Sequence, residues 1–259
     1  MSAATAGGAG PARRGELAAR LDAVRARIAA AARAAGRADE PELIVVTKFF
    51  PASDVRLLAE LGVRRVGENR DQEAAAKAAE LADLGLEWDF IGQLQTNKAK
   101  SVVRYAGAVH SIDRPQLVAA LDKAVARENE RRGAEGIPPR PRLKCLVQVD
   151  LRRAAAPGAA DSPAARGGAA PADVPALAAA IAAAGNLELS GLMAVAPLGE
   201  DPADAFARLM VVARELRREH PDAAMVSAGM SQDLEAAVAA GATHLRVGSD
   251  VLGPRPPLG

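Results

Sequence analysis

The chain alternates between short apolar runs and segments with helical periodicity along most of its length. The apolar runs span residues 43–48, 63–67, 88–92, 107–111, 143–149, 187–193, 224–227 and 243–247. Helical patterns lie between them, for example at 53–61, 70–83, 114–131, 203–218 and 231–240. Before the first run, the region from Arg13 to about Ala35 predicts one amphipathic helix, because apolar residues recur at helical spacing: Leu17, Leu21, Val24 and Ile28.

Strict alternation of strands and helices favours parallel strands joined by crossover helices. Eight such units in about 250 residues predict a closed (β/α)8 TIM barrel, with the N-terminal helix as an addition to the repeat. A doubly wound open sheet is the main alternative. It is disfavoured because no Gly-x-Gly-x-x-Gly pattern follows the first strand.

The remaining segments set the domain boundaries. Residues 1–12 are mostly small residues without an apolar core, so we expect a disordered tail followed by a single domain over 13–259. Residues 152–172 consist mainly of Arg, Ala, Gly and Pro without periodicity, which predicts a flexible loop after the fifth strand. A lid and a tolerated insertion are both compatible with this composition.

Composition narrows the function classes. A net charge of +1 and six aromatic residues (four Phe, one Trp, one Tyr) argue against a nucleic-acid partner. The single cysteine, Cys145, cannot form an intrachain disulfide and fits a reducing compartment, and no Cys/His cluster predicts a metal site. With no secretory signal and no run of membrane-spanning length, we expect a cytoplasmic protein without a membrane partner.

Lys48 ends the first apolar run and stands directly before Phe49-Phe50-Pro51. Side chains alternate along a strand, so Ile44, Val46 and Lys48 are predicted to share one face, with the amine at the carboxyl end. A lysine at the rim of a buried face loses its charge readily, and a neutral amine can form a Schiff base with an aldehyde. The alternative is a lysine that extends from the strand end into water.

Active sites of such barrels lie at the carboxyl ends of the strands, and phosphate often binds after strands seven and eight. Ser227, Gly229 and Ser231 follow the seventh run, with Ser231 at the predicted start of helix 231–240, where free N–H groups favour an anion. Gly248-Ser249 follows the eighth run and offers further donors. Helix caps and glycine turns occur wherever strands meet helices, so each motif alone is weak.

Arg246 lies in the eighth strand, which neighbours the first in a closed barrel. Pyridoxal 5′-phosphate (PLP) fits this set, because it needs a lysine aldimine, a phosphate site and a partner for its ring nitrogen. Two alternatives stay open. Arg246 could form a salt bridge with Glu68, and the barrel could bind another phosphorylated metabolite with Lys48 as a simple cation.

The chain also resembles the YggS/PROSC family of PLP homeostasis proteins, whose barrel is similar to the N-terminal domain of alanine racemase. The resemblance covers about residues 14–255 and rests on five motifs in the right order: VTK at 46–48, GEN at 67–69, FIGQLQTNK at 90–98, SAGMS at 227–231 and RVGS at 246–249. It implies a protein that binds PLP and maintains free and protein-bound PLP pools without established catalytic turnover.

Carried over by motif, the resemblance implies that Lys48 bears the aldimine and that Asn69 lies beside the cofactor. It implies that Arg246 faces the ring nitrogen. The residues implied around the phosphate are Ser227, Gly229, Met230, Gly248 and Ser249.

The sequence departs from the family's pattern at several positions. Asp89 stands where histidine is usual, Asp150 where asparagine is common, Ala228 for methionine and Ser249 for threonine. The loop at 152–172 also lacks the usual polar, lysine-containing pattern. These departures leave the aldimine lysine and the phosphate donors in place, but put in doubt a role of the strand-five loop in PLP transfer.

A PLP-dependent amino-acid racemase is the alternative from another class. It needs a second proton carrier, and Tyr105 is expected at the opposite end of the barrel, where it would pack. Cys145 is expected in the core, and His110, the best remaining candidate base, is expected to be structural. We expect a monomer that passes PLP to PLP-dependent apo-enzymes.

Overall fold

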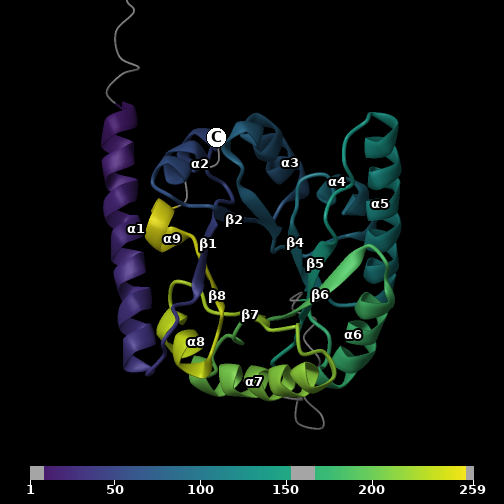
Figure 1. Ribbon diagram of the computed structural model, residues 1–259. Coiled ribbons are helices and arrows are strands. Elements are labelled where there is room, and N and C mark those ends of the chain that lie inside the picture. Colours follow the sequence, from purple (N-terminus) through teal and green to yellow (C-terminus); the bar gives the residue numbers. More distant parts are fainter. Residues whose placement is uncertain (1–8, 153–166, 255–259) are drawn as a thin grey trace, which may run out of the picture.

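A closed barrel of eight parallel strands forms the centre of the described part of the chain (Figure 1), which confirms the predicted (β/α)8 fold and excludes the open sheet. The computed structural model describes residues 9–152 and 167–254. The strands are β1 (Glu42–Val46), β2 (Arg65–Glu68), β3 (Glu87–Phe90), β4 (Ala108–Ile112), β5 (Leu143–Gln148), β6 (Leu187–Met193), β7 (Met225–Ser227) and β8 (His244–Val247). Each pairs with the next in chain order, and β8 pairs with β1 to close the sheet.

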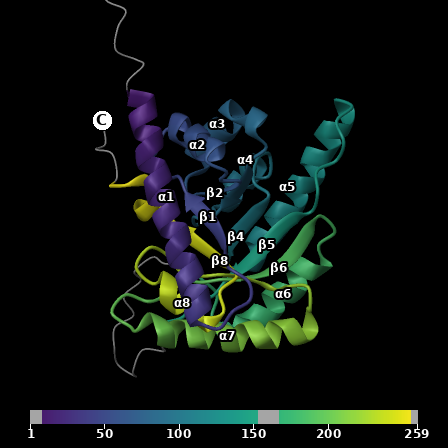
Figure 2. The ribbon, with the colours of Figure 1, turned by 60° about the vertical axis from the view of Figure 1, so that its left-hand side comes forward.

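Helices surround this barrel in Figures 1 and 2. They are α1 (Ala9–Ala34), α2 (Ala52–Glu60), α3 (Asp71–Glu80), α4 (Ala99–Val102), α5 (Pro115–Ala134), α6 (Val174–Ala183), α7 (Pro202–Glu219), α8 (Leu234–Ala240) and α9 (Ser249–Leu252). Short 3-10 turns lie at η1 (Ala82–Leu84), η2 (Thr96–Lys98) and η3 (Pro171–Asp173).

Helix α1 is the predicted addition to the repeat, and it lies along α2, α8 and α9. Its apolar stripe, from Leu17 to Ile28, is buried against them. The helix begins at Ala9, four residues before the predicted start, so residues 9–12 are helical and not part of a tail. The rest of the predicted tail, residues 1–8, lies outside the described residues.

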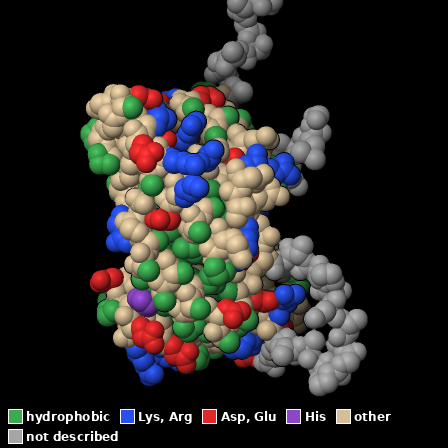
Figure 3. All heavy atoms as spheres, turned by 90° about the vertical axis from the view of Figure 1, so that its right-hand side faces the viewer, with side chains coloured by type: hydrophobic (Ala, Val, Ile, Leu, Met, Phe, Trp, Pro, Cys, Tyr) green, Lys and Arg blue, Asp and Glu red, His purple; other side chains and the backbone are tan. Residues whose placement is uncertain are grey.

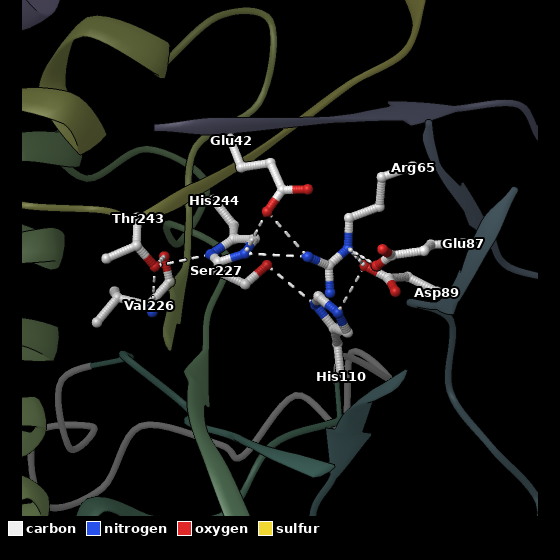
Figure 4. A network of polar contacts seen from close by, with 9 residues as sticks. All are labelled: Glu42, Arg65, Glu87, Asp89, His110, Val226, Ser227, Thr243 and His244. Atoms are coloured by element: carbon white, nitrogen blue, oxygen red, sulfur yellow. Dashed lines mark hydrogen bonds and ion pairs between the residues drawn. The ribbon is translucent and has the colours of Figure 1, made fainter. Parts of the chain in front are cut away.

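The main hydrophobic cluster lies between the strands and the helices. Strand residues such as Val45, Val66 and Val247 pack in it with helix residues such as Leu21 and Leu58. The interior of the barrel is different, because several charged and polar side chains point into it from neighbouring strands (Figure 4). This polar interior lies directly beneath the mouth where the site was predicted.

The segment after β5 differs in part from the predicted loop at 152–172. Residues 153–166 lie outside the described residues. Where the description resumes, Ala169 forms a bridge with Val149, and its backbone bonds both Gln148 and Asp150. Two backbone hydrogen bonds therefore hold Ala169 beside the end of β5, and η3 begins two residues later.

The surface carries charges of both signs. On the face shown in Figure 3, Lys and Arg side chains are interspersed with Asp and Glu, in keeping with a net charge of +1. No helix among the described residues combines the length and the apolar character that a membrane span requires.

Candidate functional site

A cavity of about 630 Å³ opens at the carboxyl ends of the strands. Its walls come from the ends of β1, β2, β3, β6 and β8 and from the loops that follow β6 and β7. Six of the eight residues that the sequence predicts for the site line this one cavity: Lys48, Asn69, Met230, Arg246, Gly248 and Ser249.

Lys48 lies two residues beyond the end of β1, in a turn rather than on the strand, and it is half-buried. Hydrogen bonds hold the backbone on both sides of it. The ammonium of Lys77 donates to the Thr47 carbonyl at 2.9 Å, and the Phe49 amide donates to Glu73 Oε1 at 2.7 Å. Phe49 has a φ of 71°, the left-handed region that non-glycine residues seldom adopt. The turn therefore fixes the position of the Lys48 backbone, from which its side chain extends.

Glu68 lies fully buried beneath this turn. Its Oε1 accepts hydrogen bonds from Thr47 Oγ1 and from Lys77 Nζ, each at 2.7 Å. Burial raises the pKa of Glu68, and the charge of Lys77 opposes that rise. The sequence left open a salt bridge between Arg246 and Glu68. Among the described residues Glu68 instead forms its salt bridge with Lys77.

Arg246 contributes a buried cation to the cavity wall. Its Nη1 donates to Ser227 Oγ at 2.7 Å, and its Nη2 donates to the Ala194 carbonyl at 2.8 Å. Both acceptors are neutral, and no carboxylate among the described residues forms an ion pair with Arg246. Burial lowers the pKa of Arg246 to about 10, so the group stays protonated at neutral pH. A buried cation without a carboxylate favours an anion or a hydrogen-bond acceptor in the cavity.

The loops after β7 and β8 meet on one side of the cavity. Ser231 Oγ lies 3.2 Å from Ser249 Oγ, and the Met230 amide donates to Asp233 Oδ1 at 2.5 Å. A Cβ at Gly248 would lie 3.1 Å from the Val46 carbonyl oxygen, so glycine permits this close approach to β1. Helix α8 begins at Leu234, not at Ser231 as predicted, because residues 231–233 form a turn. This turn places Ser231 beside Ser249.

Ser227 and Gly229, both predicted to surround a phosphate, do not line the cavity. Ser227 is fully buried beneath Arg246, where its hydroxyl contacts both that guanidinium and His110. Gly229 has a φ of 91°, and a Cβ there would lie 2.5 Å from Ala237 Cβ. The structure therefore places these two residues behind the cavity wall, where one supports Arg246 and the other packs the turn against α8.

The candidate proton carriers also lie outside this cavity. Tyr105 lines a separate groove beside Trp88, and its hydroxyl is 3.4 Å from Asp71 Oδ1. Cys145 is fully buried in the hydrophobic cluster, and burial raises its pKa. His110 is fully buried in the barrel interior, in contact with Asp89 and Ser227.

Sequence reasoning missed the loop after β6, which forms much of the cavity wall. The loop runs from Val195 to Glu200, and Leu198 at its centre is 82% exposed. The Pro197-Leu198-Gly199 sequence marks a turn, but only the structure shows that this turn lines the cavity. Loops after the strands of a barrel commonly supply such residues.

Three comparisons place this geometry among known proteins. Residues 19–256 match the family described as the alanine racemase N-terminal domain. Proteins named pyridoxal phosphate homeostasis protein are similar to the chain, at 45% identity in Mycobacterium tuberculosis (95% of each chain covered) and 35% in Escherichia coli (93% and 97%). A solved structure of PipY from Synechococcus elongatus, with PLP bound, has a TM-score of 0.72 and 34% identity over 92% of this chain and 100% of PipY.

Proposed function

We propose, because the chain belongs to the family of the alanine racemase N-terminal domain, that it binds PLP and maintains the supply of this cofactor in the cell. Two findings support this function. Relatives that match along almost their whole length are named pyridoxal phosphate homeostasis proteins, and PipY, at 34% identity, has been solved with PLP bound.

The proposal extends to a covalent link, an aldimine between PLP and Lys48. The observation that carries it is that Lys48 and Arg246 line the same cavity, together with Gly248 and Ser249. PLP requires three features: an amine that can react with its aldehyde, a partner for its ring nitrogen, and a loop whose hydroxyl and amide groups can donate to its phosphate. Lys48, Arg246 and the Gly248-Ser249 loop offer them. The cavity volume, about 630 Å³, lies within the roughly 300–1,000 Å³ typical of small-molecule sites.

Two further features of the chain fit such a ligand. Oδ1 of Asn69 is buried at the cavity and has no hydrogen-bond partner among the described residues, which is costly unless a ligand supplies a donor. Arg246 is a buried cation whose hydrogen-bond acceptors in the described part of the chain are both neutral. A ligand that offers a hydrogen-bond donor to Asn69 and an acceptor to Arg246 gives each group a partner.

We assign separate tasks to the residues around the ligand. Lys48 holds the aldehyde carbon, Met230, Gly248 and Ser249 lie around the phosphate, and Arg246 donates to the ring nitrogen. PLP, when bound, supplies an electron sink for carbanion chemistry. The Arg246 guanidinium is protonated at neutral pH and cannot accept the ring proton, so it keeps the ring nitrogen unprotonated and this electron sink weak. That arrangement favours storage over turnover.

A PLP-dependent racemase is the second candidate, and the side chains favour it less. Racemisation needs a proton carrier on the face of the cofactor opposite the lysine, and Tyr105, Cys145 and His110 all lie outside the cavity. We therefore propose a non-catalytic carrier that acts as a cytoplasmic monomer and passes PLP to apo-enzymes. Gel filtration and transfer of PLP to an apo-enzyme test these two parts.

Titration of the purified protein with PLP tests the function. We expect an imine absorption band in the wild type and in the control Lys123→Ala, which changes an exposed lysine on α5, but none in Lys48→Ala. Incubation of the PLP-loaded protein with L-alanine should give no D-alanine. Lys48-dependent racemisation would favour the enzyme, and phosphate-dependent binding without any imine band would favour another phosphorylated metabolite.

A further inference from the structure

Charged and polar side chains from four strands meet in the barrel interior (Figure 4), and one of them, Ser227, contacts Arg246. They are Arg65 on β2, Asp89 on β3, His110 on β4 and Ser227 on β7, and all four are buried. Buried polar groups of this kind are costly unless each donor meets an acceptor. Their hydrogen bonds therefore determine which atoms carry protons.

Asp89 is the member of this group that can only accept hydrogen bonds. Its Oδ2 accepts a hydrogen bond from Arg65 Nε at 2.8 Å and lies 3.1 Å from His110 Nε2. Burial opposes the charge of this carboxylate, but the charge of Arg65 and the hydrogen bonds from Arg65 and His110 favour it, and the pKa of Asp89 is lowered. An ionised carboxylate has no proton to donate, so the hydrogen of the second contact must belong to His110.

His110 is neutral in this environment. Burial lowers its pKa, and the positive charges of Arg246 and Arg65 act in the same direction, although Asp89 opposes them. A neutral imidazole carries one N–H, and the contact with Asp89 places that hydrogen on Nε2. The other nitrogen, Nδ1, is then an acceptor, and it lies 3.0 Å from Ser227 Oγ.

The hydroxyl of Ser227 links the tautomer of His110 to Arg246 at the cavity wall. Because Nδ1 of His110 can only accept, Ser227 donates its hydrogen to the imidazole and turns its lone pairs toward Arg246. The Arg246 Nη1 group donates to this oxygen at 2.7 Å, and Nη2 donates to the Ala194 carbonyl. Two acceptors thus hold the guanidinium at the cavity wall.

We propose that Asp89 is a positioning residue of the PLP site. It selects the tautomer of His110, the tautomer orients the hydroxyl of Ser227, and the hydroxyl holds Arg246 toward the cavity. The inference rests on the proposed function, since the position of Arg246 matters most when a ring nitrogen lies before it. Asp89 does not touch the cavity, so it acts only through its neighbours.

A simpler role for Asp89 would be to neutralise Arg65. However, Arg65 has a second carboxylate, because its Nη1 donates to Glu42 Oε2 at 3.0 Å, and the same Nη1 lies 3.2 Å from His244 Nε2. Replacing Asp89 therefore leaves Arg65 paired, while His110 loses the acceptor that selects its tautomer. The two roles predict different behaviour of the His110 ring.

Nitrogen-15 chemical shifts of the His110 ring in the protein without PLP test the first step. We expect the Nε2–H form in the wild type and a mixture of tautomers in Asp89→Leu, which is nearly isosteric and cannot accept a hydrogen bond. An Nδ1–H form in the wild type would overturn the proposal. This measurement does not depend on PLP binding.

Ser227→Ala tests the second step and leaves the ion pair of Asp89 with Arg65 intact, so it covers the case in which Asp89→Leu does not fold. We expect the variant to bind PLP at least about tenfold more weakly than the wild type and to show an altered absorption spectrum, because one hydrogen bond to a charged group is lost. Ser227→Thr should restore both. The control is Ser190→Ala, a buried serine on β6 whose hydroxyl contacts only Glu188 among the described residues.

The outcomes separate the two proposals. If the wild type binds no PLP, the proposed function fails, and the tautomer of His110 still tests the chain of contacts behind Arg246. If the wild type binds PLP and Ser227→Ala binds it with the same affinity and spectrum, the positioning role is refuted and the proposed function stands.

Discussion

The ammonium group of Lys77 lies 2.9 Å from the carbonyl oxygen of Thr47, the residue before Lys48. A side chain on α3 thus holds the backbone from which the proposed cofactor lysine extends. The same ammonium lies 2.7 Å from Glu68 Oε1 and 2.9 Å from Glu73 Oε1. Because Glu73 also accepts from the Phe49 amide, the backbone on both sides of Lys48 is held by one partly buried ion-pair cluster.

Replacing Lys77 with methionine should therefore weaken both the fold and the site. It leaves the fully buried Glu68 without its cation, and removal of one partner of a buried ion pair usually costs about 3–5 kcal/mol. Urea denaturation measures this loss, and PLP titration measures the effect on Lys48. Lys100→Met, at an exposed lysine on α4, is the matched control.

A second substitution separates charge from packing at this cluster. Adding Glu68→Gln to Lys77→Met removes the uncompensated carboxylate, so stability should return in part while PLP binding stays weak. If Lys77→Met binds PLP as the wild type does, the cluster has no part in placing Lys48.

Gly92 permits the backbone of Asn69 to reach the cavity. A Cβ at position 92 would lie 2.4 Å from the Asn69 carbonyl oxygen and 2.8 Å from its Cα, closer than atoms can pack. Gly92→Ala should therefore displace Asn69 and reduce PLP affinity together with the melting temperature. Gly185→Ala is the control, because a Cβ there meets no atom within 4 Å. Equal PLP affinity in the two variants would show that the position of Asn69 is unimportant for binding.

The pH dependence of stability should include a contribution from Glu42 at the amino-terminal end of the barrel. A hydrogen bond from His244 and the charge of Arg65 outweigh burial and lower the pKa of Glu42 from 4.5 to about 2. A carboxylate with a lowered folded-state pKa adds stability above the unfolded value, and this stability is lost as pH falls from about 4.5 to about 2. The side chain is half exposed, so salt should screen the effect.

Urea midpoints measured across this pH window check the assignment. Glu42→Gln should be less stable than the wild type near neutral pH, and the two curves should converge as the pH falls toward 2. Glu40→Gln, at an exposed carboxylate two residues earlier, should follow the wild type throughout. Parallel curves for Glu42→Gln and the wild type would contradict the lowered pKa.

The fold could be predicted because β/α alternation is a local signal. Each apolar run marks a strand, and eight of them separated by helices leave few topologies other than a closed barrel. The end of the first strand was predicted two residues too late, because β1 ends at Val46 and the left-handed conformation of Phe49 carries no mark in the sequence. That conformation depends on contacts with Glu73 on a different element.

The candidate site was predictable in outline, because strand ends meet at one rim of a parallel barrel. Ser227 shows the limit of this reasoning. It ends a strand of three residues, and its side chain points down toward His110 rather than into the cavity. Asp89 and Arg65 interrupt apolar runs on adjacent strands, which is a signal of a polar interior. The register pairs Arg65 with Glu87 and Asp89 with Gly67, so only the side-chain hydrogen bond in the structure shows that Arg65 and Asp89 meet.

Borohydride reduction of the PLP-treated protein, followed by peptide mass spectrometry, shows whether Lys48 forms the aldimine with PLP. We expect one pyridoxyl group, on the peptide that contains Lys48, and its loss in Lys48→Ala. If the protein carries no pyridoxyl group, or carries it on another lysine while Lys48 remains unmodified, Lys48 does not hold PLP.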